Sequence, residues 1–371
     1  MNEIHIRDAI RNLAPYRPGR PLRDLEKFGI TEGVKLASNE NPFPPSPAVR
    51  RAMEAALDDV RLYPEPGAPE LRERLAAIHG CKPTEVIAGA GIDDLLDLVA
   101  RVMLEPGDNL VLADPGFVRY VVAAGSAGGR AICVPGSTEK PYCHDLDAML
   151  AAADDRTRIM VLVNPNNPTG SMFTRAELES YFERVPPNIL TILDEAYFEF
   201  VSDPDYPDGM NYLNRDKPVL VFRTFSKIYS LAGLRVGYGV GSDLLVDHLD
   251  RARIAFNVNS VAQAAAMAAL DDQDHVRRSR EMAQTETAFL AKGLAERGWK
   301  TEPTWTNFVF AEAPLSGDHI AQGLLQRGFI IRPLGGFGMP NHFFRVSHGT
   351  RAQDEAFLAA LDEVTAEIPA S

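Results

Sequence analysis

The chain has 371 residues, of which 45% are hydrophobic and 24% are charged, an ordinary composition for a globular protein. Its formal net charge of −13 disfavours binding to nucleic acid or to an anionic membrane surface, because phosphate contacts need clustered Lys and Arg. The chain is too long for one small core, so we expect a large domain with a smaller companion.

Three cysteines, Cys81, Cys133 and Cys143, lie far apart and form no Cys-x-x-Cys pair. This pattern disfavours a disulfide framework and a thiolate metal site, and it is typical of a reducing compartment. The first residues lack the apolar core of a signal peptide, and no apolar run approaches the roughly 18 residues of a membrane helix. We therefore expect a soluble cytoplasmic protein that binds no metal.

The first 35 or so residues have an amphipathic start and a Pro-rich stretch at 14–19. We expect an arm that packs beside the C-terminal domain. Short β-branched runs then predict buried strands, at Glu85–Ala88, Asn109–Ala113, Ile159–Val163, Ile189–Leu193 and Pro218–Phe222. Stretches with helical spacing lie between them, as at Asp94–Met103 and Arg175–Phe182. This alternation predicts an α/β large domain, a mostly parallel sheet covered by helices on both faces.

The C-terminal third has a different pattern. A long helix is predicted near 276–297, followed by short strands at Asn307–Phe310, Phe329–Arg332 and Phe343–Ser347 and a final helix from about Ala352. This order predicts a smaller α+β domain. We therefore divide the chain into an arm with part of the small domain (1–35), a large domain (36–285) and a small domain (286–371).

Polar residues follow the predicted strands, where ligands gather in an open parallel sheet. The turn Asn164–Gly170 supplies the amide of Asn167. After the next strand, Asp194 could pair with a protonated pyridine nitrogen, and Tyr197 could bond a phenolic oxygen. Each feature alone is ordinary, but their order along successive strands favours one site.

A lysine, two hydroxyls and an arginine follow the last of these strands, at Lys227, Thr224, Ser226 and Arg235. This set suits covalent imine chemistry beside a phosphate. Earlier, the turn at Gly89–Asp94 joins a strand to a helix, where backbone amides can hold a phosphate.

Motifs extend this pattern over nearly the whole chain, at Leu13–Gly19, Leu36–Pro42, Tyr63–Pro66, Asn164–Gly170, Asp194–Tyr197, Thr224–Arg235, Thr306–Phe308 and Phe344–Gly349. The series resembles fold-type I pyridoxal-phosphate (PLP) aminotransferases, and within them the histidinol-phosphate aminotransferase family. The resemblance implies that Lys227 carries the cofactor as a Schiff base and then moves protons, for which its pKa must be lowered. It also implies that Asp194 keeps the ring nitrogen protonated, while Asn167 and Tyr197 bond the 3-oxygen of the ring.

The resemblance also assigns the remaining site residues. The cofactor phosphate would lie among the backbone amides of Gly91, Ile92 and Asp93 and the side chains of Thr224, Ser226 and Arg235. Tyr63 would reach this phosphate from a neighbouring subunit, which implies a homodimer with shared active sites. Phe117 would stack on the ring. The implied substrate contacts are Tyr16, Asn41, Arg332 and Arg345, of which Arg345 matches the arginine that binds the substrate anion.

Two positions depart from the family pattern. The phosphate turn commonly reads Gly-Asn-Gly-Ser-Asp-Glu, whereas this chain has Gly89-Ala-Gly-Ile-Asp-Asp94, so a contact at Ile92 must come from its backbone. The aromatic segment reads Pro-Gly-Phe117 in place of Pro-Thr-Phe or Pro-Thr-Tyr. Both positions lie near the cofactor and the substrate entrance, so they bear on substrate identity. We expect PLP binding to be kept, because Lys227, Asp194 and Arg235 are all present.

Several functions fit these residues. The first is amino transfer from histidinol phosphate to 2-oxoglutarate, and the second is the same reaction with an aromatic amino acid, because Arg345 suits a phosphate or a carboxylate. A third keeps the cofactor and changes the reaction to decarboxylation or elimination. The fourth is a non-catalytic protein of the same fold, a class whose DNA-binding members carry an extra domain for which this chain has no room.

Overall fold

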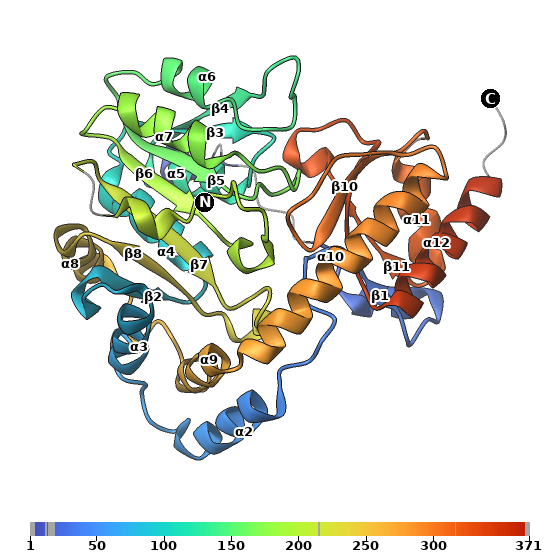
Figure 1. Ribbon diagram of the computed structural model, residues 1–371, viewed down its shortest axis with the longest axis horizontal. Coiled ribbons are helices and arrows are strands. Elements are labelled where there is room, and N and C mark those ends of the chain that lie inside the picture. The colour runs from blue at the N-terminus through green and yellow to red at the C-terminus, as the bar shows by residue number, and fades with distance from the viewer. Residues whose placement is uncertain (1–3, 12, 14–18, 214–215, 316, 368–371) are drawn as a thin grey trace.

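The computed structural model describes residues 4–11, 13, 19–213, 216–315 and 317–367, and it has two lobes (Figure 1). We call them the large unit and the small unit. The large unit surrounds a seven-stranded sheet, and the small unit contains a four-stranded and a two-stranded sheet.

The seven-stranded sheet has the order β2-β8-β7-β6-β5-β3-β4. Its strands are β2 (Val86–Gly89), β3 (Asn109–Asp114), β4 (Arg130–Pro135), β5 (Thr157–Val163), β6 (Leu190–Asp194), β7 (Val219–Thr224) and β8 (Gly237–Gly241). Only β8 runs antiparallel to its neighbours. The carboxyl ends of β5, β6 and β7 therefore meet at one edge, together with the end of β2 and the start of β8.

Helices cover both faces of this sheet because alternate strand residues point to opposite sides. Ile159 and Val161 pack with α4 (Ile92–Met103), α5 (Arg119–Ala127) and α8 (Asp243–Ala252), while Met160 and Leu162 pack with α6 (Leu146–Ala151) and α7 (Arg175–Arg184). Beside β2 and β8 lie α2 (Pro47–Ala56), α3 (Pro69–His79) and α9 (Ser260–Asp271). The predicted mostly parallel sheet with helices on both faces is thus confirmed.

The small unit is built on the antiparallel sheet β12-β13-β10-β9. Its strands are β9 (Lys300–Thr301), β10 (Phe308–Glu312), β12 (Arg332–Pro333) and β13 (Phe343–Ser347). Three helices pack on this sheet, α10 (Gln273–Ala295), α11 (Gly317–Gln326) and α12 (Arg351–Ala366). The two-stranded sheet pairs β1 (Val34–Lys35) with β11 (Phe329–Ile330), so the N-terminal segment contributes a strand to this unit.

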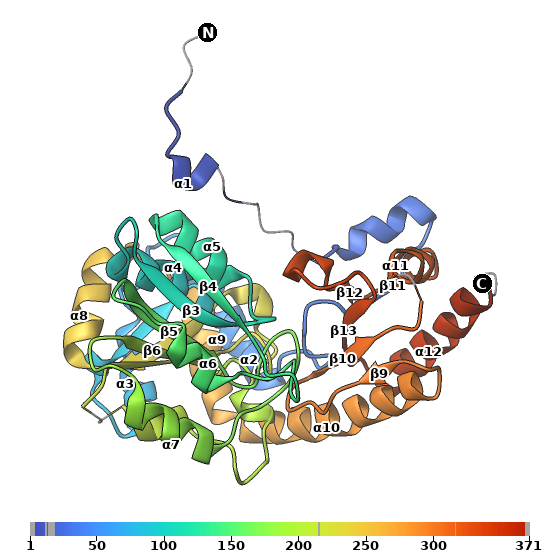
Figure 2. The same ribbon diagram turned by 90° about the horizontal axis from the view of Figure 1, so that it is seen from above.

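The N-terminal segment, which we expected beside the C-terminal domain, contacts both units. Its 3-10 helix η1 (Leu22–Phe28) buries Leu25 in the small unit. The helix α1 (Asp8–Arg11) lies near α5 instead (Figure 2). Arg7 donates to the carbonyl of Ala127 at 3.4 Å, and Leu13 packs on Gly125, where the absence of a side chain admits it.

Helix α10 extends from the large unit to the small one (Figures 1 and 2). Its first half buries Val276 and Ala283 beside loops of the large unit, and its second half buries Leu290 and Leu294 in the small unit. The boundary after residue 285 falls inside this continuous helix, and we keep it as a proposal.

Two strands of the large sheet have no counterpart among the predicted ones. Edge strand β4 is exposed at Arg130 and Pro135, so it lacks a continuous apolar run. Strand β8 contains three glycines, which weaken strand propensity. Among the described residues, no helix combines the length and the apolar character needed to cross a lipid bilayer.

Candidate active site

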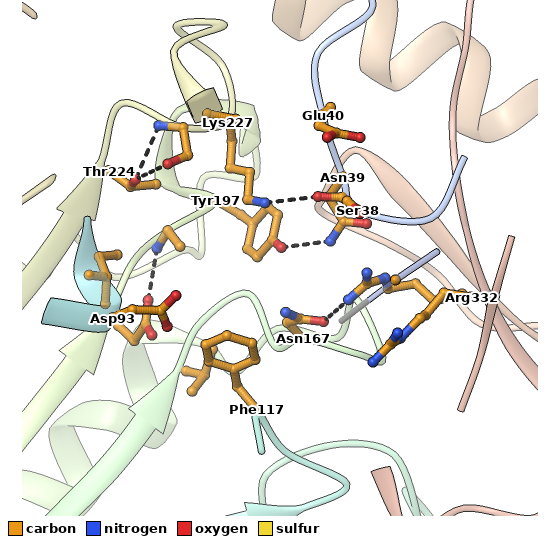
Figure 3. A pocket seen from close by; sticks show the side chains of 18 of the residues that line it. Ser38, Asn39, Glu40, Asp93, Phe117, Asn167, Tyr197, Thr224, Lys227 and Arg332 are labelled. Carbon is orange, nitrogen blue, oxygen red and sulfur yellow. Dashed lines mark hydrogen bonds between the residues drawn. The ribbon is translucent and has the colours of Figure 1, made fainter. Parts of the chain in front are cut away.

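A cavity of about 270 Å³ lies where the carboxyl edge of the large sheet faces the small unit. Twelve of the predicted site residues line it: Ile92, Asp93, Phe117, Asn167, Asp194, Tyr197, Thr224, Ser226, Lys227, Arg235, Arg332 and Arg345. They come from both units, and Figure 3 shows many of them facing the same space.

Lys227 lies just beyond β7, and its side chain runs beside Tyr197 into the cavity (Figure 3). Its ammonium group donates a hydrogen bond to the carbonyl of Ser38 at 3.1 Å. Burial, together with the positive charge of Arg345 as a smaller cause, lowers the pKa of Lys227 to about 8. A larger share of this amine is therefore neutral near pH 8 than for an exposed lysine, which suits a nucleophile and a proton acceptor.

Asp194 is the last residue of β6, and only 3% of its surface is exposed. One carboxylate oxygen accepts from the backbone N–H of Ala196 at 3.1 Å, and the other accepts from the Tyr120 hydroxyl at 2.8 Å. Burial raises the pKa of Asp194 to about 6, against the lowering effect of the Tyr120 hydrogen bond. A buried carboxylate of this kind suits a cationic partner such as a protonated ring nitrogen.

Asn167 and Tyr197 present an amide and a phenol to the middle of the cavity (Figure 3). Asn167 Oδ1 accepts from Arg345 Nη1 at 2.5 Å, which leaves its NH₂ group as the donor for a ligand. The Tyr197 hydroxyl oxygen accepts from Asn39 Nδ2 at 2.7 Å. Both groups can thus donate toward an oxygen of a bound ring.

The N-terminus of α4 forms a cradle that suits a phosphate. Gly91 caps this helix with a φ of +83°, and a side chain there would place Cβ only 2.5 Å from Arg235 Nη2. The Thr224 and Ser226 hydroxyls are 3.0 Å apart, and Arg235 Nη1 donates to Ser226 Oγ at 3.4 Å. The Gly91 N–H donates to the carbonyl of Gly89 at 2.7 Å, so the next amides of the helix, two hydroxyls and a guanidinium make up the donor set that suits a phosphate, and these residues fit the predicted cofactor.

Two arginines approach the cavity from the small unit. Arg345 on β13 is 6% exposed and donates from Nη2 to the carbonyl of Ala37 at 2.7 Å. Arg332 on β12 is paired with Arg345 in the sheet register, and its guanidinium carbon lies 5.3 Å from the centre of the Phe337 ring. This end of the cavity can bind an anion with two parallel hydrogen bonds.

Phe117 precedes α5 and lies below Asn167 in the view of Figure 3. Its ring meets that of Tyr120 edge-on, with centroids 6.3 Å apart. Phe117 is only partly buried, so one side remains available to a planar ligand.

Two predicted residues within the described part of the chain, Tyr63 and Asn41, are not brought to this cavity. Tyr63 is 82% exposed and stacks on Phe256 at a centroid distance of 4.6 Å. Asn41 uses its amide to hold the chain, since Nδ2 donates to Ile228 and Ser279 and Oδ1 accepts from Phe43, so a substrate contact there is not supported. Tyr16 lies outside the described residues.

Other residues of the site were not predicted individually. Ser38, Asn39 and Glu40 line the cavity, and the motif Leu36–Pro42 that contains them was the available signal. Tyr120 gave no such signal, because nothing in the sequence places the second residue of an amphipathic helix beside the end of β6.

Comparisons with known proteins agree with this geometry. A sequence model of the family "Aminotransferase class I and II" matches residues 31–361. The histidinol-phosphate aminotransferase of Moorella thermoacetica is 43% identical, over 97% of this chain and 93% of the relative. That of Caldicellulosiruptor saccharolyticus is 40% identical, over 96% of this chain and 99% of the relative.

A solved structure agrees with these sequence matches. The histidinol-phosphate aminotransferase of Sinorhizobium meliloti, in complex with pyridoxal-5'-phosphate, superposes with a TM-score of 0.88. It is 29% identical, and the match covers 98% of both chains. These findings confirm the resemblance drawn from the motifs: the chain belongs to the class I and II aminotransferase family, and within it to the histidinol-phosphate aminotransferases.

Proposed function

We propose that this aminotransferase takes its amino group from histidinol phosphate and passes it to a 2-oxo acid, with 2-oxoglutarate as acceptor and PLP as cofactor. The names of its relatives support the donor and the cofactor. The observation that carries the proposal is the pair Arg345 and Arg332 at the end of the cavity away from the phosphate cradle. A substrate with its own anion would be held there while its amine reaches Lys227.

Different residues of the chain would hold different parts of the cofactor. The α4 amides with Thr224, Ser226 and Arg235 would bind the phosphate, and Asp194 would hold the ring nitrogen protonated. Asn167 and Tyr197 would donate to the ring's 3-oxygen, and Phe117 would cover one ring face. When bound, PLP supplies an aldehyde that condenses with amines and a ring that withdraws electrons from the substrate carbon.

Lys227 would hold the cofactor in the resting enzyme and then move the proton at the substrate carbon. Its pKa of about 8 supports this role, because the neutral amine accepts a proton and the resulting ammonium returns it. The position of Lys227 between the two units would limit the access of water to this exchange, since its partly buried amine lies against Ser38 of the connecting segment.

The arginine pair would select the substrate by its anion. Arg345 is held by Asn167 and Ala37 with its guanidinium nearly buried, so its charge is weakly screened. The ring of Phe337 lies beside Arg332 and adds an apolar wall. A phosphate monoester carries more charge than a carboxylate and binds such a pair more strongly.

We further propose a homodimer with shared active sites. Tyr63 is exposed with apolar neighbours in sequence that are also exposed, namely Leu57, Val60 and Leu62, and it stacks on the exposed Phe256. An exposed apolar group of this kind suits an interface. Tyr63 would reach the phosphate cradle of the second subunit.

Mixed dimers test this arrangement. Lys227→Ala and Tyr63→Ala subunits are each expected to be impaired alone. If Tyr63 acts across the interface, the mixed dimer contains one site with both residues intact and regains part of the activity. No recovery in a verified mixed dimer would mean that Tyr63 serves its own subunit or neither.

We place the enzyme in the cytoplasm, also as a proposal. Cys81, Cys133 and Cys143 are unpaired thiols, which fits a reducing compartment.

A half-reaction tests the proposed substrate. Purified enzyme loaded with PLP is mixed with histidinol phosphate or, separately, with phenylalanine, and loss of the cofactor's visible absorption is followed. We expect histidinol phosphate to act at a far lower concentration. If phenylalanine acts at the lower concentration, the site binds a carboxylate and a ring, and the enzyme is an aromatic aminotransferase. Release of CO₂ from phenylalanine, the one of the two compounds that has a carboxylate, would indicate decarboxylation instead.

A further inference from the structure

Asn39 is buried between the two units with its polar groups engaged. It is 1% exposed, and its φ of +57° lies in the left-handed region. Its backbone N–H donates to Ser347 Oγ at 2.9 Å, and its carbonyl accepts from Asn307 Nδ2 at 3.0 Å. Its amide accepts from Ser347 Oγ at 2.9 Å and donates to the Tyr197 oxygen at 2.7 Å.

These hydrogen bonds have a fixed direction. The chain of donors starts at the Asn39 backbone N–H, which cannot act as an acceptor. Ser347 Oγ accepts there, and in the structure it gives its own hydrogen to Asn39 Oδ1. This sets the orientation of the amide, so that Nδ2 faces Tyr197 and donates to it.

The phenolic hydrogen of Tyr197 consequently points away from Asn39. The oxygen already accepts a hydrogen bond from the amide, and an NH₂ group has no capacity to accept one in return. Figure 3 shows the Tyr197 hydroxyl facing Asn39 on one side and the open cavity on the other. The hydrogen is thus left for a partner other than Asn39, and the proposed one is an oxygen of the cofactor ring.

The same segment is fastened to the strand that carries the substrate arginine. Ser347 and Arg345 are two residues apart on β13, so their side chains lie on one face of the small sheet. Ser347 bonds Asn39, and Arg345 Nη2 donates to the carbonyl of Ala37. Residues 37–39 therefore connect the anion-binding arginine to Tyr197.

We propose that Asn39 is a positioning residue that directs the Tyr197 proton into the cavity, and that Ser347 fixes the Asn39 amide for this purpose. The inference rests on the proposed function, in which Tyr197 donates to the 3-oxygen of PLP. Asparagine suits the position because it tolerates positive φ better than other residues with side chains and offers a donor and an acceptor on one planar group.

The test uses Asn39→Asp, which keeps the shape and removes the donor. Its carboxylate would accept the Tyr197 hydrogen and turn it away from the cavity. The readouts are the PLP dissociation constant and the pH midpoint of the visible absorption of the loaded enzyme. Donation from Tyr197 stabilises the deprotonated 3-oxygen and so lowers this midpoint. We expect Asn39→Asp to raise it by about one pH unit and to weaken PLP binding about tenfold.

Tyr197→Phe is the reference, and it should shift the midpoint in the same direction. The double variant should then shift no further than Tyr197→Phe alone, because both changes remove one donation. Exposed Asn211→Asp adds the same charge elsewhere and should leave both readouts unchanged. A midpoint unchanged by Asn39→Asp, with Tyr197→Phe shifted, would overturn the inference. No shift in either variant would instead count against the proposed role of Tyr197.

Two further variants keep the inference testable if Asn39→Asp folds poorly. Asn39→Gly retains the positive φ without the side chain. Ser347→Ala leaves the amide in place and removes the group that orients it. Each should raise the midpoint by less than Asn39→Asp, because the Tyr197 hydroxyl becomes free to turn and is not drawn away. Wild-type midpoints in both variants, with melting temperatures near the wild type, would contradict the inference.

Discussion

The two ends of the cavity are built in different ways. The cofactor end comes from one sheet, since Asp194, Thr224 and the N-terminus of α4 lie at adjoining strand ends and their spacing follows from the strand register. The substrate end combines Arg345 of β13 with Ala37 of the N-terminal segment, which are 308 residues apart in the chain.

This difference has a functional consequence. The phosphate cradle at the cofactor end lies within one packed core, so its geometry depends little on the small unit, whereas Asn167 and Tyr197 are also held by Arg345 and Asn39. The substrate end forms only where three segments meet: β13 with Arg345, the N-terminal segment with Ala37, and the turn with Asn167. It can therefore adjust to a substrate without disturbing the phosphate cradle. Variants at the two ends should therefore separate cofactor affinity from substrate affinity.

The largest effect is expected at Lys227, where the two ends meet. Lys227→Ala removes the amine that holds the cofactor and moves the proton, so turnover should fall by at least about 10⁴-fold. PLP should still bind through the phosphate cradle, but without the visible band of the lysine-linked form. Exposed Lys292→Ala on α10 is the matched control and should behave as the wild type. Retention of the wild-type band in Lys227→Ala would disprove the assignment.

Arg345→Lys should affect the substrate end far more than the cofactor end, which Arg345 contacts through its hydrogen bond to Asn167. The charge remains, but the planar fork that pairs with an anion is lost, so kcat/KM for the amino donor should fall about 100-fold. The PLP dissociation constant should change by less than about threefold. Arg351→Lys, in an ion pair with Glu286 outside the cavity, serves as the control. A comparable loss of PLP affinity in Arg345→Lys would show that the two ends are not separable.

The same contrast explains how much the sequence could predict. Asp194, Asn167 and Lys227 follow apolar runs, and a parallel sheet brings such positions together without further information. The family motif identified Arg345, but its contacts with Asn167 and Ala37 required the packing of the small unit. Tyr120 went unpredicted because the bond to Asp194 depends on how α5 lies on the sheet.

The sequence pattern also fails where a residue's surroundings decide its role. Asn41 and Asn39 stand in one motif, yet the structure directs Asn41 to Ile228 and Ser279 and Asn39 to Tyr197. Strand β8 was missed because its glycines obscure the apolar pattern. Those glycines allow close approach, since a Cβ on Gly237 would lie 3.1 Å from the backbone nitrogen of Ile92.

Gly91→Ala should weaken the cofactor end specifically. The added Cβ would lie 2.5 Å from Arg235 Nη2 and would push this flexible guanidinium out of the cradle, and the φ of +83° strains any side chain. We expect the PLP dissociation constant to rise about 10-fold to 100-fold, from a loss of roughly 1.4–2.8 kcal/mol, while KM for the donor at saturating PLP stays near the wild type. Gly107 has a similar φ of +94° with open space around it, so Gly107→Ala introduces the same backbone strain without a contact to Arg235. Equal PLP affinities in the two variants would exclude the cradle assignment.

Tyr120→Phe should give the smallest effect, visible only in the pH dependence. Tyr120 donates to Asp194 and lowers its pKa, which burial raises to about 6. Removing the hydroxyl therefore raises this pKa further, so less of the carboxylate is ionised between about pH 6 and 7.

PLP affinity, measured on the cofactor-free protein, should decrease at low pH as Asp194 becomes protonated. The midpoint of this decrease should lie about one pH unit higher in Tyr120→Phe than in the wild type. Above about pH 8 Asp194 is ionised in both proteins, and their affinities should converge. The control is Tyr181→Phe, which loses a buried hydroxyl contact of 2.9 Å with Thr191 on the opposite face of the sheet. A similar shift in that variant would trace the effect to general loosening of the core, whereas a shift confined to Tyr120→Phe locates it at Asp194.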